Sequence, residues 1–223
     1  DYHVWADQAD AGVHVDSGLT EMDSLFHVWD PATKMKCVIF EENGGLHNMQ
    51  RALGHATILN AVRRHGDFVM TSCPANALQP YRQNDNSWDQ GQIFFTPAKV
   101  WGMPPFYVQK MASANYLPER IYSAMEGAGL DVSATRSETG NALVIHVVNT
   151  SSEPVHSRIL LKYFTGAGRE IKAWTLSAGS EEENTLQDPM KISPKETLIN
   201  TESVLENGFV FPPFSYVILR FEK

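Results

Sequence analysis

Short apolar segments alternate with amphipathic ones over the first 126 residues. Three segments have the composition of β-strands, at 1–6, 34–43 and 67–73, and the second is apolar on both faces, as strands of helix-covered parallel sheets are. Apolar residues recur at helical spacing over three further segments, at 19–29, 46–64 and 104–115. This strand–helix alternation predicts a parallel sheet or barrel covered by helices.

The strands of this first part are too few to close a barrel or to build a well-covered open sheet. Asp1 also begins directly in a strand-like segment, with no initiator methionine and no leader pattern before it. We therefore expect that the chain is cut from a longer protein and that further strands precede Asp1.

From about residue 127 the helical spacing gives way to strand-like segments separated by Gly, Pro, Asn and Ser clusters. These segments lie at 130–138, 141–150, 156–165, 170–176 and 214–223. Spacing of about ten residues predicts an antiparallel β-sandwich. The stretch 177–191 is polar, and we expect an exposed loop in which the glutamates at 181–183 form a solvated face.

The predicted fold class is α/β plus all-β. Residues 1–126 are expected to form the last strands of a partial (β/α)8 catalytic barrel. Residues 127–223 are expected to form a C-terminal antiparallel β-sandwich domain.

Composition narrows the class of protein. Hydrophobic residues make up 43% of the chain and charged residues 20%, which is enough to build a core and excludes a disordered chain. A net charge of −8 disfavours nucleic acid as a partner and is compatible with a neutral, sugar-like substrate. The apolar runs fall far below the ~18 residues that cross a bilayer, so we expect no membrane partner. Cys37 and Cys73 both lie in apolar runs, which favours buried free thiols.

Two adjacent carboxylates, Glu41 and Glu42, close the apolar strand 34–43. In β/α barrels, active sites lie at the carboxyl ends of strands, and ionisable groups there are costly unless something needs them. The alternative is that both are solvated in the first turn of the next helix, where the helix dipole favours anions. Side chains alternate along a strand, so at most one of the two should face the barrel mouth.

His3 and Trp5 share a face of another strand and could contact a carboxylate or a sugar, or could simply fill the core.

The long segment 73–95 follows the third strand and is rich in amide side chains. Asn76, Gln79 and Trp88 are candidates for binding sugar hydroxyls and stacking on a sugar ring, and an ordinary polar loop is the equal alternative. The histidines at 47, 55 and 65 lack the three- or four-residue spacing of metal ligands on a helix. We therefore expect no metal and no cofactor.

Taken together, these segments resemble the α-L-arabinofuranosidases of glycoside hydrolase family 51 over most of the chain. DYHVWA resembles the strand-six motif Asp-x-His-x-Tyr, and KCVIFEENGG resembles the strand-seven motifs GEYA and FDEWN, whose Glu is the nucleophile. The helix and strand after it, the segment VWGMPPFYVQKMAS and the tail FPPFSYVILRF continue the match. The resemblance implies a (β/α)8 barrel followed by a β-sandwich.

Aligning FDEWN with FEENG places Glu42 at the nucleophile and Glu41 at the residue before it. We expect the Glu42 carboxylate on the same side of the sheet as His3 and Trp5, with Glu41 turned toward the helices. His3 takes the place of the family's strand-six His, and Trp5 takes the place of a Tyr that contacts the nucleophile. Asn43 replaces the Tyr or Trp that usually follows the nucleophile.

The family's general acid/base lies on strand four, and no matching motif occurs in this chain. A retaining glycosidase needs two carboxyl groups about 5–5.5 Å apart. The resemblance therefore implies a fragment that carries the nucleophile and is inactive alone, from an enzyme that releases terminal α-L-arabinofuranosyl residues from arabinose-containing oligo- or polysaccharides. It also implies a secreted or periplasmic protein that can form homo-oligomers.

Two other hypotheses stay open. The first is a non-catalytic carbohydrate-binding β-sandwich, which would place the ligand on 127–223. The second is a related endo-glucanase or xylosidase on the same scaffold.

Overall fold

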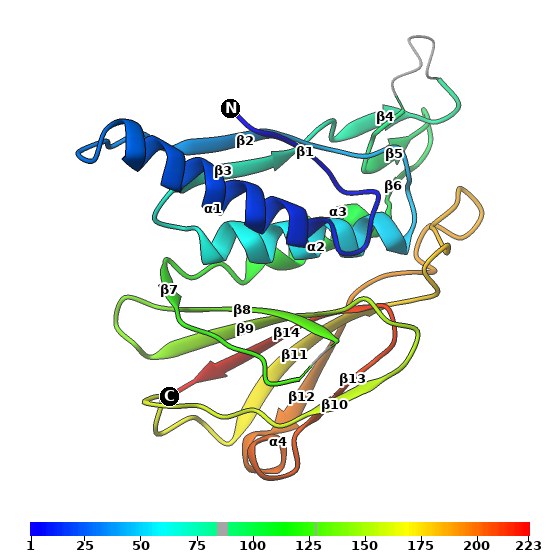
Figure 1. The fold of residues 1–223 in the computed structure, drawn as a ribbon. Helices are drawn as coiled ribbons and strands as arrows, with labels where there is room; N and C mark the ends of the chain where they lie inside the picture. Colours follow the sequence, from blue (N-terminus) through cyan, green and yellow to red (C-terminus); the bar gives the residue numbers. More distant parts are fainter. Residues whose placement is uncertain (84–88, 128) are drawn as a thin grey trace.

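The computed structural model describes residues 1–83, 89–127 and 129–223 and arranges them in four layers (Figure 1). A parallel sheet lies at one end, three helices lie beneath it, a larger antiparallel sheet follows, and a short helix with a two-stranded ribbon covers the far side. The fold class expected from the sequence, a partial β/α unit followed by an antiparallel β-structure, is confirmed. No helix among the described residues is long and apolar enough to span a bilayer.

The described residues form four helices, α1 (Ala11–Trp29), α2 (Met49–Arg64), α3 (Pro104–Ala114) and α4 (Thr201–Asn207). Strands of the first half are β1 (His3–Trp5), β2 (Cys37–Asn43), β3 (Val69–Pro74), β4 (Leu78–Pro80), β5 (Ile93–Phe95), β6 (Val100–Gly102) and β7 (Glu119–Ile121). Strands of the second half are β8 (Leu130–Arg136), β9 (Ala142–Asn149), β10 (Val155–Ser157), β11 (Glu170–Ser177), β12 (Lys195–Asn200), β13 (Phe209–Phe211) and β14 (Ser215–Glu222).

The parallel sheet has the order β1-β2-β3, and in the part of the chain that the structure describes, helices cover one of its faces and not the other. Apolar side chains of α1 and α2 pack with Val4, Ile39 and Val69 against that covered face. On the other face Trp5 is 59% exposed and Met70 is 73% exposed. The sheet therefore presents an open face, and the carboxyl ends of its three strands meet at one edge.

Helix α1 begins eight residues before the helix expected at 19–29. Its first turns use small residues at the contact positions, and a Cβ added to Gly12 would come within 2.2 Å of the Thr57 carbonyl oxygen on α2. A stretch that buries Ala11 and Gly12 gives a weak apolar signal, although it packs closely against its neighbour.

Helix α2 is central to the molecule. Ile58 and Ala61 pack toward the parallel sheet, whereas Met49, Leu53 and Ala56 belong to the core shared with α3 and the antiparallel sheet. Its N-terminus is held by a segment distant in sequence, because the backbone amides of Met49 and Gln50 donate to the carbonyl oxygens of Glu182 and Ser180.

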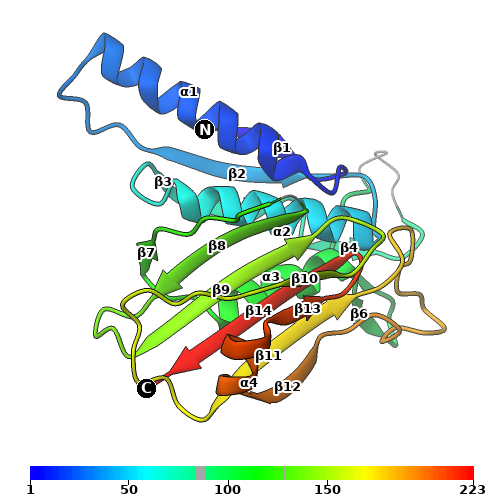
Figure 2. The ribbon, with the colours of Figure 1, turned by 60° about the horizontal axis from the view of Figure 1, so that its bottom comes forward.

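The antiparallel sheet has six strands in the order β12-β11-β14-β9-β8-β7 (Figure 2). One face packs on α2 and α3, and the other is covered by α4 and the ribbon β10–β13. Because β7 pairs with β8, antiparallel pairing begins before the boundary expected at 126 and 127. The division into two domains at that boundary stays a prediction.

Three expectations for the second half need correction. The strand expected at 156–165 is limited to β10, which pairs with β13 outside the six-stranded sheet, and the chain after it packs Ile159, Leu161 and Phe164 on the core of the outer face. A helix, α4, interrupts the second half. The loop 177–191 keeps its three glutamates exposed, but Asn184 is buried and its amide donates to the carbonyl oxygens of Gly102 and Ile192.

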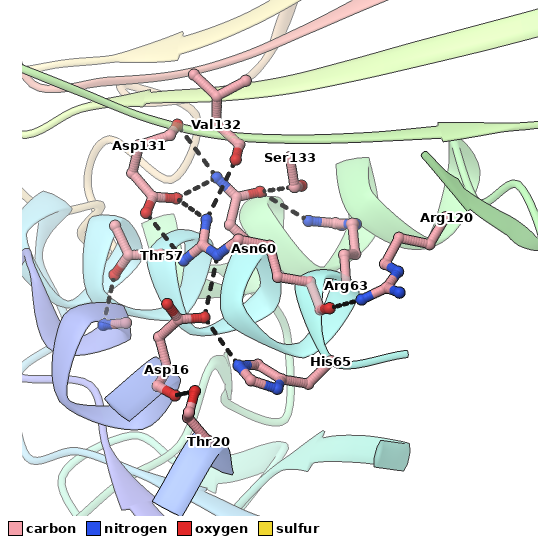
Figure 3. Close-up of polar contacts among 12 residues, drawn as sticks. Asp16, Thr20, Thr57, Asn60, Arg63, His65, Arg120, Asp131, Val132 and Ser133 are labelled. Carbon is pink, nitrogen blue, oxygen red and sulfur yellow. Dashed lines mark hydrogen bonds and ion pairs between the residues drawn. The ribbon is translucent and has the colours of Figure 1, made fainter. Parts of the chain in front are cut away.

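A polar seam joins α2 to the antiparallel sheet (Figure 3). Asn60 is fully buried, and its amide nitrogen donates to Asp131 while its oxygen accepts from Ser133 Oγ at 2.7 Å. Arg64 joins the same seam through contacts of 3.1 Å with Asp16 and Asp131. Buried polar groups of this kind are costly to leave unpaired.

Replacing Asn60 by leucine should therefore destabilise the protein by about 2–4 kcal/mol, since Ser133 and the Asp131 carbonyl oxygen both lose their partner. The shift of the denaturant midpoint measures the loss. Arg136→Ala is the control, because the Arg136–Glu119 pair is exposed and should contribute only about 0–1 kcal/mol. Equal effects of the two variants would contradict the role given to the seam.

His146 lies on the face of β9 that packs against α2, and it is buried beside Tyr216. Its Nδ1 lies 2.8 Å from the Tyr216 hydroxyl. Burial, and to a smaller degree the Arg63 charge, lower the pKa of His146 well below its usual value. A lowered histidine pKa favours the neutral form in the folded state, so the stability it contributes is full above the unfolded pKa of ~6.5 and is lost as the pH falls below it.

The melting temperature should therefore drop between about pH 7.5 and about pH 5, and it should drop less in His146→Asn. Asparagine keeps a polar atom where Nδ1 contacts Tyr216 and does not titrate in this range. Melting curves of both proteins at both pH values measure the difference. Parallel pH dependence would show that His146 does not contribute to it.

Candidate active site

Strand β2 carries a β-bulge at its carboxyl end. Ile39 pairs with Ser72 of β3 and Glu42 pairs with Pro74, so β2 uses three residue steps where β3 uses two. Ile39 and Glu42 consequently both point into the helix layer and are fully buried, although regular alternation would place them on opposite faces. The expected orientation of the two glutamates is wrong, because the bulge inverts the alternation after Ile39.

The Glu42 side chain lies between the sheet and helices α2 and α3, with 0% exposure. Its Oε2 accepts from His55 Nδ1 at 2.7 Å and from Gln109 Nε2 at 2.9 Å. Its Oε1 accepts from the Ser72 hydroxyl. Both carboxylate oxygens are thus satisfied by donors from α2, α3 and β3, which is what a buried carboxylate requires.

The hydrogen bonds of His55 fix the position of its proton. Its Nε2 accepts from Arg51 Nε at 3.2 Å, and a guanidinium can only donate, so the proton resides on Nδ1, which faces Glu42. Burial lowers the pKa of His55, and the opposing effect of Glu42 is smaller. The imidazole is therefore neutral. It accepts a hydrogen bond from Arg51 and donates one to Glu42.

Arg51 lies in the first turn of α2 and is itself buried, and its guanidinium reaches the loop that follows β2. Its Nη1 donates to the Leu46 carbonyl oxygen at 2.9 Å. Burial lowers the pKa of Arg51 to about 10, against the raising effects of Asp7 and Glu42. It stays a cation at neutral pH, close to the buried Glu42.

Glu41 emerges on the open face of the sheet, directly beside β1. It pairs in register with His3, and Glu41 Oε2 lies 3.1 Å from His3 Nδ1. The amide nitrogen of Asn43 lies 3.3 Å from the same oxygen. The side chains of His3 and Glu41 are 51% and 38% exposed. Glu41 is therefore a carboxylate that solvent and a substrate can reach, with donors already beside it.

Asp1 contacts the ring nitrogen of His3 that does not face Glu41. His3 Nε2 lies 2.8 Å from Asp1 Oδ2, and Asp1 Oδ1 accepts from the backbone amide of Phe40 at 3.3 Å. The imidazole thus lies between two carboxylates, and it can donate to both only when both ring nitrogens carry protons. This arrangement orients the ring toward Glu41.

The other residues proposed from the sequence fall into different places. Trp5 lies on the open face with His3, so that expectation of a shared face is confirmed. Asn76 follows β3 and donates to the Leu78 carbonyl oxygen. Gln79 is buried and donates to the Gln83 carbonyl oxygen. Its side chain therefore stabilises its own loop and is not exposed to a ligand. Trp88 lies outside the described residues.

The sequence reasoning missed His55, Gln109 and Ser72, which surround Glu42. A signal was present, because Arg51 and His55 stand four residues apart on the buried side of a helix, where polar side chains need partners. Within the described residues, no group of His, Cys, Asp or Glu side chains is arranged to hold a metal ion.

The fold defines a class in which a helix-covered parallel sheet is followed by a larger antiparallel sheet. A family model described as the α-L-arabinofuranosidase C-terminal domain matches residues 27–215, and the chain belongs to that family.

Individual relatives agree with this assignment. α-L-Arabinofuranosidase 2 of Arabidopsis thaliana is 25% identical over 177 residues, which are 76% of this chain and 26% of that protein. An arabinose-bound family 51 α-L-arabinofuranosidase superposes on 100% of this chain and 36% of its own, with a TM-score of 0.80 and 19% identity. The Thermotoga maritima α-L-arabinofuranosidase in complex with arabinose covers 97% of this chain and 49% of its own, with a TM-score of 0.79 and 17% identity. The chain thus spans about a quarter to a half of the lengths of these relatives.

Proposed function

We propose that this chain is the C-terminal part of a retaining α-L-arabinofuranosidase and that it supplies the catalytic nucleophile. The substrate would be a terminal α-L-arabinofuranosyl residue of an arabinose-containing oligo- or polysaccharide. Family membership supports the class of substrate. The observation that carries the site is the Glu41 carboxylate, which reaches the open face at the end of β2 within 3.1 Å of His3.

Glu41 is a better nucleophile candidate than Glu42. A nucleophile must reach the anomeric carbon, and Glu42 is enclosed by three donors in the helix layer. Glu41 is partly exposed, is next to His3 and the amide of Asn43, and lies at the carboxyl end of a parallel strand, where barrel active sites form. The motif FDEWN also aligns with Ile39–Asn43 when its Asn is matched to Asn43, which places Glu41 at the Glu.

In the proposed reaction a Glu41 oxygen attacks the anomeric carbon and forms a glycosyl ester. The bond to the leaving oxygen breaks as a second carboxylic acid protonates that oxygen. The resulting carboxylate then takes a proton from water, and the water oxygen displaces Glu41 from the anomeric carbon. The second carboxyl group would come from outside this chain, from the part of a longer protein that completes the barrel.

Hydrolysis by the full-length enzyme, meaning the protein that carries this chain together with the proposed remainder of the barrel, tests the function. We expect turnover of an aryl α-L-arabinofuranoside in preference to the matching β-D-xyloside and β-D-glucoside. Proton NMR of the first-formed sugar should show the α-anomer, because two displacements retain configuration. Preference for xyloside or glucoside, or a β-anomeric product, would overturn the proposal.

A separate sugar-binding function of the antiparallel part has less support. Both faces of the six-stranded sheet are covered, one by α2 and α3 and the other by α4 and its neighbours. The Trp174 indole nitrogen donates to Glu196 at 2.9 Å, so its polar edge is already engaged.

A further inference from the structure

Beneath the open face lies a group of polar side chains that the proposed reaction does not use. We call it the buried cluster, and it comprises Glu42, Arg51, His55, Ser72, Gln92 and Gln109. Four of its members, Glu42, Arg51, His55 and Gln92, are buried. Together they connect β2 to β3, α2, α3 and the loop before β5.

The buried cluster acts on the strand that carries Glu41. Glu42 follows Glu41 directly, and its carboxylate is held on the helix side by donors that come from three other elements. A strand that drops the bulge would shift by one residue, and a one-residue shift exchanges the two faces. Glu42 would then reach the open face and Glu41 would turn into the helix layer.

We propose that the buried cluster selects the bulged register of β2 and thereby presents Glu41, rather than Glu42, to the substrate. Glu42 and His55 are positioning residues in this inference, which rests on the proposed function. The choice between adjacent carboxylates is made by which of them finds donors in the helix layer. A carboxylate without those donors is strongly disfavoured there.

The chain of donors has a fixed direction. Arg51 can only donate, so it holds His55 Nε2 as an acceptor and leaves the proton on Nδ1 for Glu42. Arg51 is anchored in turn to the Leu46 carbonyl oxygen, in the loop that follows β2. Helix α2 therefore presents one preformed donor at the position where Glu42 must be held.

Two variants of His55 in the full-length enzyme separate this role from packing. His55→Leu removes the donor to Glu42, whereas His55→Asn keeps a donor at the position of Nδ1. We expect kcat per active site to fall about 10- to 100-fold in His55→Leu, since small displacements of a reacting group have effects of this size. His55→Asn should stay within about fivefold of the parent, and KM should change little in both. His27→Leu on the exposed side of α1 is the matched control and should leave kcat unchanged.

The decisive measurement identifies the labelled carboxylate. An epoxide with the α-L-arabinofuranose configuration alkylates the nucleophile, and peptide mass spectrometry locates the ester. The same label counts active sites, so misfolded protein does not enter kcat. We expect label on Glu41 alone in the parent enzyme and in His55→Asn. We expect a measurable share on Glu42 in His55→Leu, because that variant loses the donor that keeps Glu42 inside.

The possible failures are distinguishable. A parent enzyme labelled on Glu42, or inactive on arabinofuranosides, overturns the proposed function. A parent labelled on Glu41, with His55→Leu equally fast and labelled only on Glu41, overturns the register inference and leaves the proposed function standing. Equal losses of kcat in His55→Leu and His55→Asn would also overturn it, because the donor would then not be what matters.

Discussion

Glu41→Ala in the full-length enzyme is expected to lower kcat for an aryl α-L-arabinofuranoside by about four orders of magnitude or more, as the loss of a nucleophile does in other enzymes. The reason is structural. Glu41 is the member of the adjacent pair that lies on the open face beside His3, and Glu42 is enclosed among donors and cannot replace it without a change of register.

Azide provides the second readout for this variant. The anion can occupy the space left by the carboxylate and attack the anomeric carbon from the same side. Because this is a single displacement, the product should be the β-configured arabinofuranosyl azide, and rate recovery should depend on azide concentration. Recovery by azide in Glu42→Ala and not in Glu41→Ala would contradict the assignment and return the role to Glu42.

His3→Leu is expected to lower kcat/KM by roughly 10²-fold, the size found when a group that acts on the reacting carboxylate is removed. His3 Nδ1 lies 3.1 Å from Glu41, and Asp1 holds the opposite side of the ring. Without the imidazole, Glu41 loses the neighbouring group that orients it.

His3→Asn is the matched variant, because its amide nitrogen can occupy the position of Nδ1. It should recover at least about half of the loss on a logarithmic scale. The pH profile of kcat/KM for both variants gives a further check. If leucine and asparagine at this position reduce kcat/KM equally, the donor at Nδ1 is not what matters and His3 only fills space.

The spacing of apolar residues was sufficient to predict most of the elements. Strands β1, β2, β8, β9 and β14 and helices α2 and α3 lie within the segments expected from the sequence, and β3 and β11 extend one residue beyond theirs. These elements bury side chains with a regular period. Helix α1 was predicted too short, because Ala11 and Gly12 make close contacts through small side chains that carry little hydrophobic signal.

The site was harder to predict, and one irregularity explains why. Regular alternation of side chains holds from Cys37 to Ile39, and both side chains are buried against the helices. It then failed at Glu41 and Glu42, because a bulge depends on pairing with β3 and on donors from α2 and α3, which are far away in sequence. His3 and Trp5 lie on β1, whose pairing with β2 is regular, and their shared face was predicted correctly.

The capping of α2 by the antiparallel part makes the two halves of the chain unsuitable for separation as interchangeable building blocks. Met49 and Gln50 at the start of α2 donate to carbonyl oxygens of Glu182 and Ser180, and Leu53 packs into the core that includes strands of the antiparallel sheet. The same helix carries His55, which donates to Glu42 beneath the open face of the parallel sheet. A chimaera that exchanges the antiparallel part would therefore leave backbone amides and apolar surface uncovered on the helix that supports the site. Engineers who want to graft a different accessory domain would have to transplant α2 with its partners, or place the junction before β2.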